Sequence, residues 1–576
     1  MQIDAIDRLR ARLRMLYGPR AEDCLSDVIR LCRQYEDRLK GRPRRPAWDQ
    51  RDAVLITYAD QIRAHDARPL AALRAFLTER GLHRLFPVLH LLPFYPSTSD
   101  DGFSVADYRQ VDPDFGDWSD VARLGEQFEL MFDLVLNHAS RQSDWFQHYL
   151  RGTEPYTGYF VECDPRTDLS RVVRPRTSPL LTPFDTARGR RHVWTTFSDD
   201  QVDLNYREPR LLCEMLDVLL TYIERGARIV RLDAVAFLWK EPGTPCVHLP
   251  QTHEVVKLLR DVVDAVAPGA LLLTETNVPH AENARYWGDG DEAHLIYNFS
   301  LPPLLLDALL TGDAGHLTRW LATCPPPPPG TTLLNFTASH DGIGIRPLES
   351  LVPPERIASL LAAVEARGGS VSRRVGPHGD ASPYELNITY FDALGDPSAA
   401  ASELQVRRFL ASQALMLALR GIPAVYFHSL IGTPNDLAGV ARTGRARAIN
   451  RRKFSAVELE RLLNTPSIAH RVLDAYARLL ETRANQPAFH PDAEQHVLPL
   501  DNPATVAVLR SDSESHQELL VAASVSDRSQ AVDLSRLALR AAGADLVTGE
   551  VTRATDQITL DPYQVMWLPV RRVRLE

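Results

Sequence analysis

The stretch that decides the fold is Arg228-Ile229-Val230-Arg231-Leu232-Asp233-Ala234-Val235, a short β-rich run that is apolar apart from its charged positions. Seven further runs of this kind alternate with helical patterns, at residues 53–58, 86–93, 130–137, 271–275, 295–299, 332–336 and 424–427. Near-continuous apolar strands separated by helices indicate a parallel sheet that is covered on both faces. Eight such strands predict an α/β protein with a (β/α)8 TIM barrel.

Several parts of the chain do not fit simple strand–helix units and predict additions to the barrel. Leu9, Leu13 and Leu16 recur at helical spacing before the first strand. Long polar stretches follow the third and seventh strands, and short β runs begin after residue 488. We therefore expect a helical N-terminal extension at 1–50, barrel segments at 51–139, 206–342 and 401–487, an inserted domain B at 140–205, a second insertion at 343–400, and an all-β C-terminal domain at 488–576.

The composition excludes several classes of function. The 576 residues are 44% hydrophobic and 24% charged with a net charge of −9, so there is no global basic field to recruit nucleic acid. No apolar run reaches about 20 residues and the charged start does not resemble a secretory signal, so we expect no membrane partner. Six cysteines without CxxC spacing are typical of reduced thiols and predict a cytoplasmic location. The sequence has no ATP-, NAD- or zincin-type motif.

Polar and charged side chains lie at the C-terminal ends of four of the predicted strands. Asn137-His138, Arg231 with Asp233, Glu275, and His340-Asp341 would all point into the mouth of a barrel. One such carboxylate alone is as readily explained by an ordinary buried salt bridge. Three around one pocket favour glycosyl transfer with retention, in which one carboxylate attacks the anomeric carbon, one transfers protons and one stabilises the oxocarbenium-like transition state.

These strand ends resemble the signature regions of the α-amylase superfamily. Six further segments are similar to the sucrose phosphorylase subgroup: residues 92–95 (LPFY), 99–103 (SDDGF), 174–176 (RPR), 301–305 (LPPLL), 340–344 (HDGIG) and 449–451 (INR). Three features are similar to glucosylglycerate phosphorylases: the helical leader, residues 194–206 (WTTFSDDQVDLNY) and residues 274–280 (TETNVPH).

The resemblance implies a role for each matched position. Asp233 would be the nucleophile, Glu275 the general acid/base and Asp341 the transition-state stabiliser. We expect an arginine beside the nucleophile to lower its pKa, and burial and repulsion to raise that of the acid. The glucosyl-binding residues would be Asp100, Phe103, His138, Arg231, His340 and Arg451. Asn137 matches a calcium ligand of some amylases, but the subgroup implies neither a metal nor an organic cofactor.

A phosphorylase must also bring phosphate, here a substrate, close to carboxylates that repel it, and arginines suit this task. By resemblance, Arg176 faces phosphate and Tyr384 belongs to a mobile acceptor loop. Arg445 and Arg447 supply two more cations, each of which is as readily a solvated surface residue. Glu385 stands where some sucrose phosphorylases have glutamine. Its charge either pairs with an arginine or changes the position of the loop, and the sequence leaves both alternatives open.

The implied reaction is retaining phosphorolysis of 2-O-α-D-glucosyl-D-glycerate to α-D-glucose 1-phosphate and D-glycerate. Glycerate and phosphate are both anions, so one cationic acceptor site would bind each in turn, whereas neutral fructose gains nothing from such charge. Phosphorolysis of sucrose, glucosylglycerol or sucrose 6'-phosphate is the near alternative. A retaining α-glucosidase or transglucosidase is the more distant one, and the oligomeric state is left open.

Overall fold

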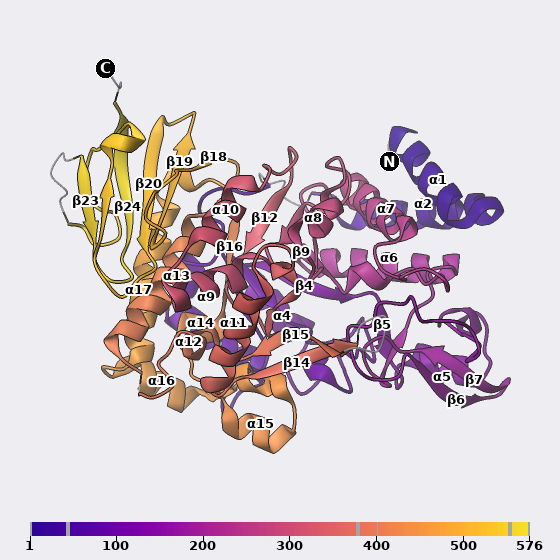
Figure 1. The fold of residues 1–576 in the computed structure, drawn as a ribbon. Helices are drawn as coiled ribbons and strands as arrows, with labels where there is room; N and C mark the ends of the chain where they lie inside the picture. Colours follow the sequence, from indigo (N-terminus) through magenta and orange to yellow (C-terminus); the bar gives the residue numbers. More distant parts are fainter. Residues whose placement is uncertain (1–2, 42–46, 376–380, 400, 551–555, 574–576) are drawn as a thin grey trace.

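The eight predicted strands form one closed parallel barrel in a computed structural model, which describes residues 3–41, 47–375, 381–399, 401–550 and 556–573 (Figure 1). They are β1 (Val54–Thr57), β3 (Val88–Leu91), β4 (Glu129–Val135), β9 (Ala227–Asp233), β10 (Leu271–Thr274), β11 (Leu295–Tyr297), β12 (Thr332–Asn335) and β16 (Ile422–Tyr426). The strands follow one another around the barrel in chain order, and β16 closes it against β1. The prediction of a (β/α)8 barrel is confirmed.

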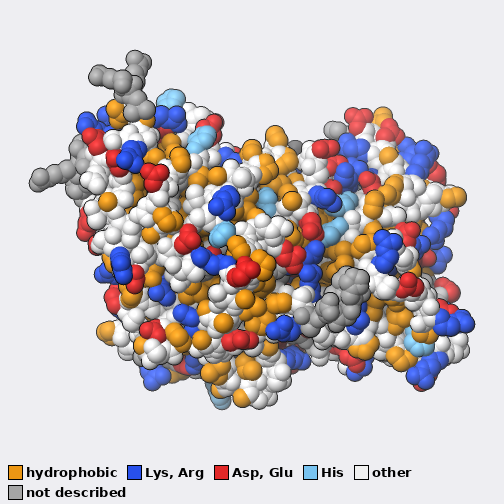
Figure 2. Space-filling view, in the orientation of Figure 1, with side chains coloured by type: hydrophobic (Ala, Val, Ile, Leu, Met, Phe, Trp, Pro, Cys, Tyr) orange, Lys and Arg blue, Asp and Glu red, His pale blue; other side chains and the backbone are white. Residues whose placement is uncertain are grey.

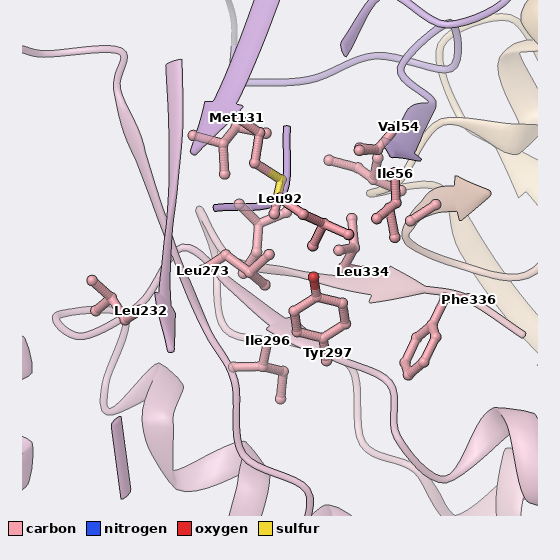
Figure 3. Packing of buried hydrophobic residues seen from close by; sticks show 14 of the residues in the cluster. Val54, Ile56, Leu92, Met131, Leu232, Leu273, Ile296, Tyr297, Leu334 and Phe336 are labelled. Carbon is pink, nitrogen blue, oxygen red and sulfur yellow. The ribbon is translucent and has the colours of Figure 1, made fainter. Parts of the chain in front are cut away.

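The barrel interior is a packed apolar core. All residues of β1, β3, β10 and β11 are buried, as expected for parallel strands covered on both faces. Figure 3 shows Val54, Met131, Leu273, Tyr297 and Leu334 packing together from different strands. The outer layer contains α3 (Pro69–Glu79), α4 (Trp118–Gly125), α6 (Pro209–Glu224), α7 (Pro250–Val266), α9 (Leu301–Thr311), α10 (Gly315–Thr323), α13 (Glu403–Ala418), α16 (Ala456–Asn464) and α17 (Ile468–Ala484).

Two helices precede the first strand, α1 (Ile3–Tyr17) and α2 (Ala21–Arg38), and they pack on α6 and α7 (Figure 1). The leucines at helical spacing, Leu9, Leu13 and Leu16, are buried in this contact. The Tyr17 hydroxyl donates to the Tyr206 carbonyl oxygen at 2.9 Å. The extension is therefore joined to the barrel by apolar packing and by a buried hydrogen bond.

The stretches that interrupt the barrel form small elements above its carboxyl-terminal end. Between β4 and β9 lie β5 (His138–Ser140), α5 (Asp144–Leu150), β6 (Leu181–Thr186), β7 (Gly189–Trp194) and β8 (Gln201–Asp203). After β12 lie β13 (Ile343–Gly344), α11 (Pro354–Ala366), β14 (Ser370–Val375) and β15 (Ala381–Asn387), in which β15 pairs with both other strands. Figure 1 shows the β14–β15 pair extending toward the first insertion.

The C-terminal part is rich in strands, as predicted. β18 (Glu494–Val497), β19 (Thr505–Asp512), β20 (Gln517–Ser524), β24 (Val565–Arg572) and β22 (Leu539–Ala541) form a five-stranded sheet, and β21 (Gln530–Asp533) pairs with β23 (Gln557–Leu560). This sheet and the N-terminal helices lie at opposite ends of the molecule (Figure 1). Across the described residues, no helix is both long and apolar enough to cross a membrane. Figure 2 shows acidic and basic side chains intermixed over one face.

Candidate active site

One cavity at the carboxyl-terminal mouth of the barrel gathers most of the predicted site residues. Its lining includes Asp100, Phe103, His138, Arg176, Asp233, Glu275, His340, Asp341, Tyr384 and Arg447. Asp233 is the last residue of β9, and Glu275 follows directly after β10, so the barrel itself delivers both carboxylates to this mouth. Arg231, Arg451 and Arg445 are not in the lining. The first two support it from behind, whereas Arg445 is more than half exposed near the rim.

Arg231 joins two carboxylates beneath the cavity floor. Its Nη1 donates to Asp233 Oδ1 at 2.7 Å and to Asp133 Oδ1 at 2.5 Å. Burial raises the pKa of Asp233, and Arg231 opposes this shift only in part, while Asp133 adds to it. The expectation of a lowered pKa for this carboxylate is therefore wrong, because burial outweighs an arginine that is shared with a second carboxylate.

Glu275 is held against the backbone beside Asp233. Its Oε2 accepts from the Ala234 N–H at 3.0 Å. Ala234 adopts a left-handed conformation with φ 49°, which is costly for a residue other than glycine. Burial raises the pKa of Glu275 to about 7; Arg231 opposes the shift, and the charges of Asp233 and Asp341 add to it. The predicted rise in the pKa of this acid is confirmed.

Asp341 has the opposite electrostatic environment. Arg447 Nη1 lies 2.5 Å from Asp341 Oδ1, and Arg451 Nη2 lies 3.7 Å from the same atom. Burial works against its charge, but Arg447, His340 and Arg451 together hold the pKa of Asp341 well below its usual range. The cavity thus contains one carboxylate that is firmly ionised and one, Glu275, that can exchange a proton near neutral pH.

An aromatic wall and a strained turn border the same end of the cavity. The rings of Phe103 and His340 stack with centroids 4.7 Å apart and planes within 4°. His138 Nε2 lies 2.9 Å from the Phe103 carbonyl oxygen, so this ring is fixed by the same turn. Asp100 and Asp101 both have positive φ, 52° and 50°, and Arg451 Nη1 lies 2.5 Å from Asp101 Oδ2. The same Nη1 lies 3.5 Å from Asp100 Oδ1, so Arg451 helps to hold Asp100 at the cavity wall.

Arg176 and Tyr384 approach each other across the cavity from the two insertions. The Arg176 guanidinium lies 5.6 Å from the centroid of the Tyr384 ring and 5.9 Å from that of Phe197. Within the part of the chain that the structure describes, Arg176 has no ion pair. Burial raises the pKa of Tyr384 to about 12. This arginine therefore has its charge available for an anionic ligand.

Glu385 resolves one question that the sequence left open, because it pairs with an arginine. Arg447 donates to both of its oxygens, at 2.9 and 2.6 Å, and the Gly342 N–H donates to Oε1 at 2.7 Å. Arg447 therefore bridges Glu385 and Asp341. Arg447 thus favours the ionised form of Asp341 and also lines the cavity.

We predict that Glu385→Ala destabilises the protein by about 3 kcal/mol, because Arg447 Nε, Arg447 Nη2 and the Gly342 N–H all lose their acceptor inside the protein. Thermal unfolding with and without the substitution checks this. Glu403→Ala is the matched control: Glu403 is 59% exposed and pairs with Arg407 and Arg471 at the surface, so it should cost less than about 1 kcal/mol. Equal Tm values for the Glu385→Ala variant and the parent protein would contradict the bridging role.

Several residues near the cavity were not identified as site residues from the sequence, among them four with charged or amide side chains. Asp133 lies below the floor, and Asn277, Arg346 and Arg374 contribute to the lining. Asp133 could have been identified from the sequence, because it is a carboxylate inside an apolar run on the strand next to that of Arg231. The two arginines lie in the second insertion, where no strand-end rule gives the direction of a side chain.

Lys240 contacts Asn137, the residue that matches a calcium ligand of some amylases. Lys240 Nζ lies 2.7 Å from Asn137 Oδ1 and 2.7 Å from Asp203 Oδ2. Burial lowers the pKa of Lys240, and Asp203 opposes this. Among the described residues, no group of three or more His, Cys, Asp or Glu side chains is arranged to hold a metal ion.

Comparison with known proteins places this site in a family. The family described as "Alpha amylase, catalytic domain" matches residues 85–314. The glucosylglycerate phosphorylase of Allomeiothermus silvanus is 47% identical over 96% of this chain and 97% of its own, and that of Escherichia coli is 46% identical over 92% and 94%. The crystal structure of sucrose 6F-phosphate phosphorylase from Thermoanaerobacter thermosaccharolyticum covers 82% of this chain and 94% of its own, with 25% identity and a TM-score of 0.72. The chain belongs to the α-amylase family, in the group that includes these phosphorylases.

Proposed function

We propose that the protein catalyses retaining phosphorolysis of 2-O-α-D-glucosyl-D-glycerate, giving α-D-glucose 1-phosphate and D-glycerate in a reversible hexosyl transfer. The observation that carries this proposal is the near full-length similarity to glucosylglycerate phosphorylases. The gathering of Asp233, Glu275 and Asp341 around one cavity supports the reaction class.

The first displacement uses the two carboxylates at the ends of β9 and β10. Asp233 attacks C1 of the glucosyl group while Glu275 donates its proton to the departing glycerate oxygen, and Asp341 stabilises the positive charge that develops at the ring. A glucosyl ester of Asp233 results. A pKa of about 7 suits Glu275 for this task, since a large fraction is protonated at neutral pH.

The second displacement replaces glycerate with phosphate. Glu275, now ionised, accepts a proton from phosphate, whose oxygen attacks C1 from the side that the leaving group vacated. Two inversions give net retention. Arg176 is proposed to bind the phosphate, because it lines the cavity beside Tyr384 and its charge is not neutralised by a described carboxylate. Arg447 would hold Asp341 during this step, and a role for Arg445 at the rim stays a prediction.

We propose that neither step needs a metal ion. The Lys240 ammonium supplies a positive charge between Asp203 and Asn137, the residue that matches a calcium ligand of some amylases. The glucosyl-binding roles of Asp100, Phe103, His138 and His340 are part of the same proposal. Arg231 and Arg451 lie outside the lining, so for them we propose an indirect role through Asp233 and Asp101. All six cysteines are free thiols, which supports the expectation of a cytoplasmic enzyme.

The test is incubation with phosphate and each of glucosylglycerate, sucrose and glucosylglycerol, following α-glucose 1-phosphate. We expect the highest kcat/KM with glucosylglycerate. A clear preference for sucrose would favour a sucrose phosphorylase, and glucose release without phosphate would favour a hydrolase. Either result would overturn the proposed substrate or reaction.

A further inference from the structure

Two arginines of the second insertion line the cavity, and the catalytic steps described above use neither of them. Arg346 lies two residues after the end of β13, and Arg374 lies on β14 of the same small sheet. We propose that Arg346 and Arg374 form the site that binds the carboxylate of an acidic acceptor and so select glycerate over neutral polyols. This inference rests on the proposed function, and it names the residues that would set its acceptor specificity.

Each guanidinium is fixed on one side and keeps donors for a ligand. Arg346 Nη2 donates to Glu282 Oε2 at 3.1 Å, and its buried Nε makes no hydrogen bond in the described chain but lies 3.9 Å from Oε2 of Glu349, a half-exposed carboxylate. Arg374 Nε donates to Ser382 Oγ at 3.1 Å and its Nη2 to Glu349 Oε1 at 2.9 Å. The two side chains are only 17% and 21% exposed. A guanidinium has five N–H donors, so both retain the capacity to bind a carboxylate.

Among the residues that the structure describes, Arg346 and Arg374 pair only with the partly exposed carboxylates of Glu282 and Glu349, whereas the other arginines around the cavity hold a site carboxylate, have another proposed role or lie outside the lining. Arg447 bridges Glu385 and Asp341, and Arg451 pairs with Asp101. Arg445 lies 3.9 Å from Asp101 and is 53% exposed. Arg176 is proposed for phosphate. Arg346 and Arg374 are therefore the remaining arginines of the cavity lining, as the structure describes it.

Asn277 lies between Glu275, the proposed acid/base, and the strand that leads to Arg346. It also lines the cavity, two residues after Glu275, and its Oδ1 is buried with no hydrogen-bond partner among the described residues. A Cβ on Gly344 would lie 2.3 Å from that oxygen, so the Asn277 amide packs directly on the strand that leads to Arg346. In 2-O-glucosylglycerate the carboxyl carbon is bonded to the carbon that bears the glycosidic oxygen. An acceptor protonated by Glu275 thus has its carboxylate next to the bond that breaks, and Asn277, Arg346 and Arg374 line the same cavity as Glu275.

The test measures acceptor choice in the synthetic direction. With α-glucose 1-phosphate as donor, kcat/KM is determined for glycerate and for glycerol, which lacks the carboxylate. Arg346→Gln and Arg374→Gln should each lower the glycerate-to-glycerol ratio by about 10-fold, and the double variant by about 100-fold. Arg373→Gln is the matched control: Arg373 is the exposed neighbour of Arg374 on β14 and is not in the cavity lining. It should leave the ratio unchanged.

The outcomes separate this inference from the proposed function. A parent enzyme that does not phosphorolyse glucosylglycerate would overturn the proposed function itself. A parent enzyme that prefers glycerate, with variants that keep this ratio, would overturn only the role of the arginines. An unchanged ratio with a raised KM for phosphate would assign the pair to phosphate and also contradict the inference. If the double variant does not fold, the single variants decide, and Arg346→Lys and Arg374→Lys should keep most of the preference.

Discussion

Replacing Asp233 with alanine should lower kcat for phosphorolysis on the order of 10³-fold or more, because the covalent route loses its nucleophile. The loss should occur with glucosylglycerate and with any other α-glucoside the enzyme accepts. Initial rates of α-glucose 1-phosphate formation check the prediction. Substrate binding should survive, and calorimetry on the variant would show it.

This substitution should not unfold the protein. Arg231 keeps Asp133 at 2.5 Å, so the buried guanidinium is not left without a carboxylate. Burial also disfavours the charge of Asp233, so its removal relieves an unfavourable desolvation. We expect a Tm equal to or above that of the parent protein. Asp527→Ala, at an exposed position of the C-terminal part, is the control for activity and should have no effect. An Asp233→Ala variant with normal turnover would refute the assignment of Asp233 as the nucleophile.

Replacing Glu275 with glutamine should lower the phosphorolysis rate by about 10² to 10⁴-fold, the range typical of a lost general acid. Glucosyl transfer from α-glucosyl fluoride should suffer far less in the first displacement, since fluoride leaves without a proton. Comparing fluoride release with glycerate release in the variant measures this difference. An equal loss with both substrates would show that Glu275 has some other role.

The raised pKa of Glu275 predicts how phosphorolysis depends on pH. Glu275 must be protonated to donate, so kcat/KM for phosphorolysis should fall as the pH rises above about 7, the pKa of this carboxyl. The Glu275→Gln variant has no proton to lose at this position and should lack this alkaline limb. Profiles of kcat/KM against pH for both proteins provide the test. An identical alkaline limb in the variant would assign it to another group.

The barrel was predictable because its signal is local. Each strand is a short apolar run, and β10 (Leu271–Thr274) lies wholly within the predicted stretch 271–275. The trio was predictable for a related reason: parallel strands deliver their last residues to one end of a barrel. Asp233 and Glu275 needed only this rule. The matched motifs then indicated which carboxylate would perform which step.

What the sequence did not reveal depends on contacts between distant segments. Arg231 and Asp133 are 98 residues apart, and Arg447 and Glu385 are 62 apart. The pKa of Asp233 follows from how deeply it is buried and from how its arginine is shared, which are properties of the assembled barrel. Arg346 and Arg374 reach the cavity only because the strands of the second insertion form a sheet beside it.

The most direct test of the central claim is to trap the glucosyl-enzyme. The Glu275→Gln variant is incubated with α-glucosyl fluoride, and its peptides are analysed by mass spectrometry. The variant should accumulate a glucosyl ester, because glutamine cannot deprotonate the incoming acceptor. We predict one added glucosyl group, carried by the peptide that contains Asp233. A glucosyl group on a different residue, or fluoride release with no adduct at Asp233 at any time, would contradict the account.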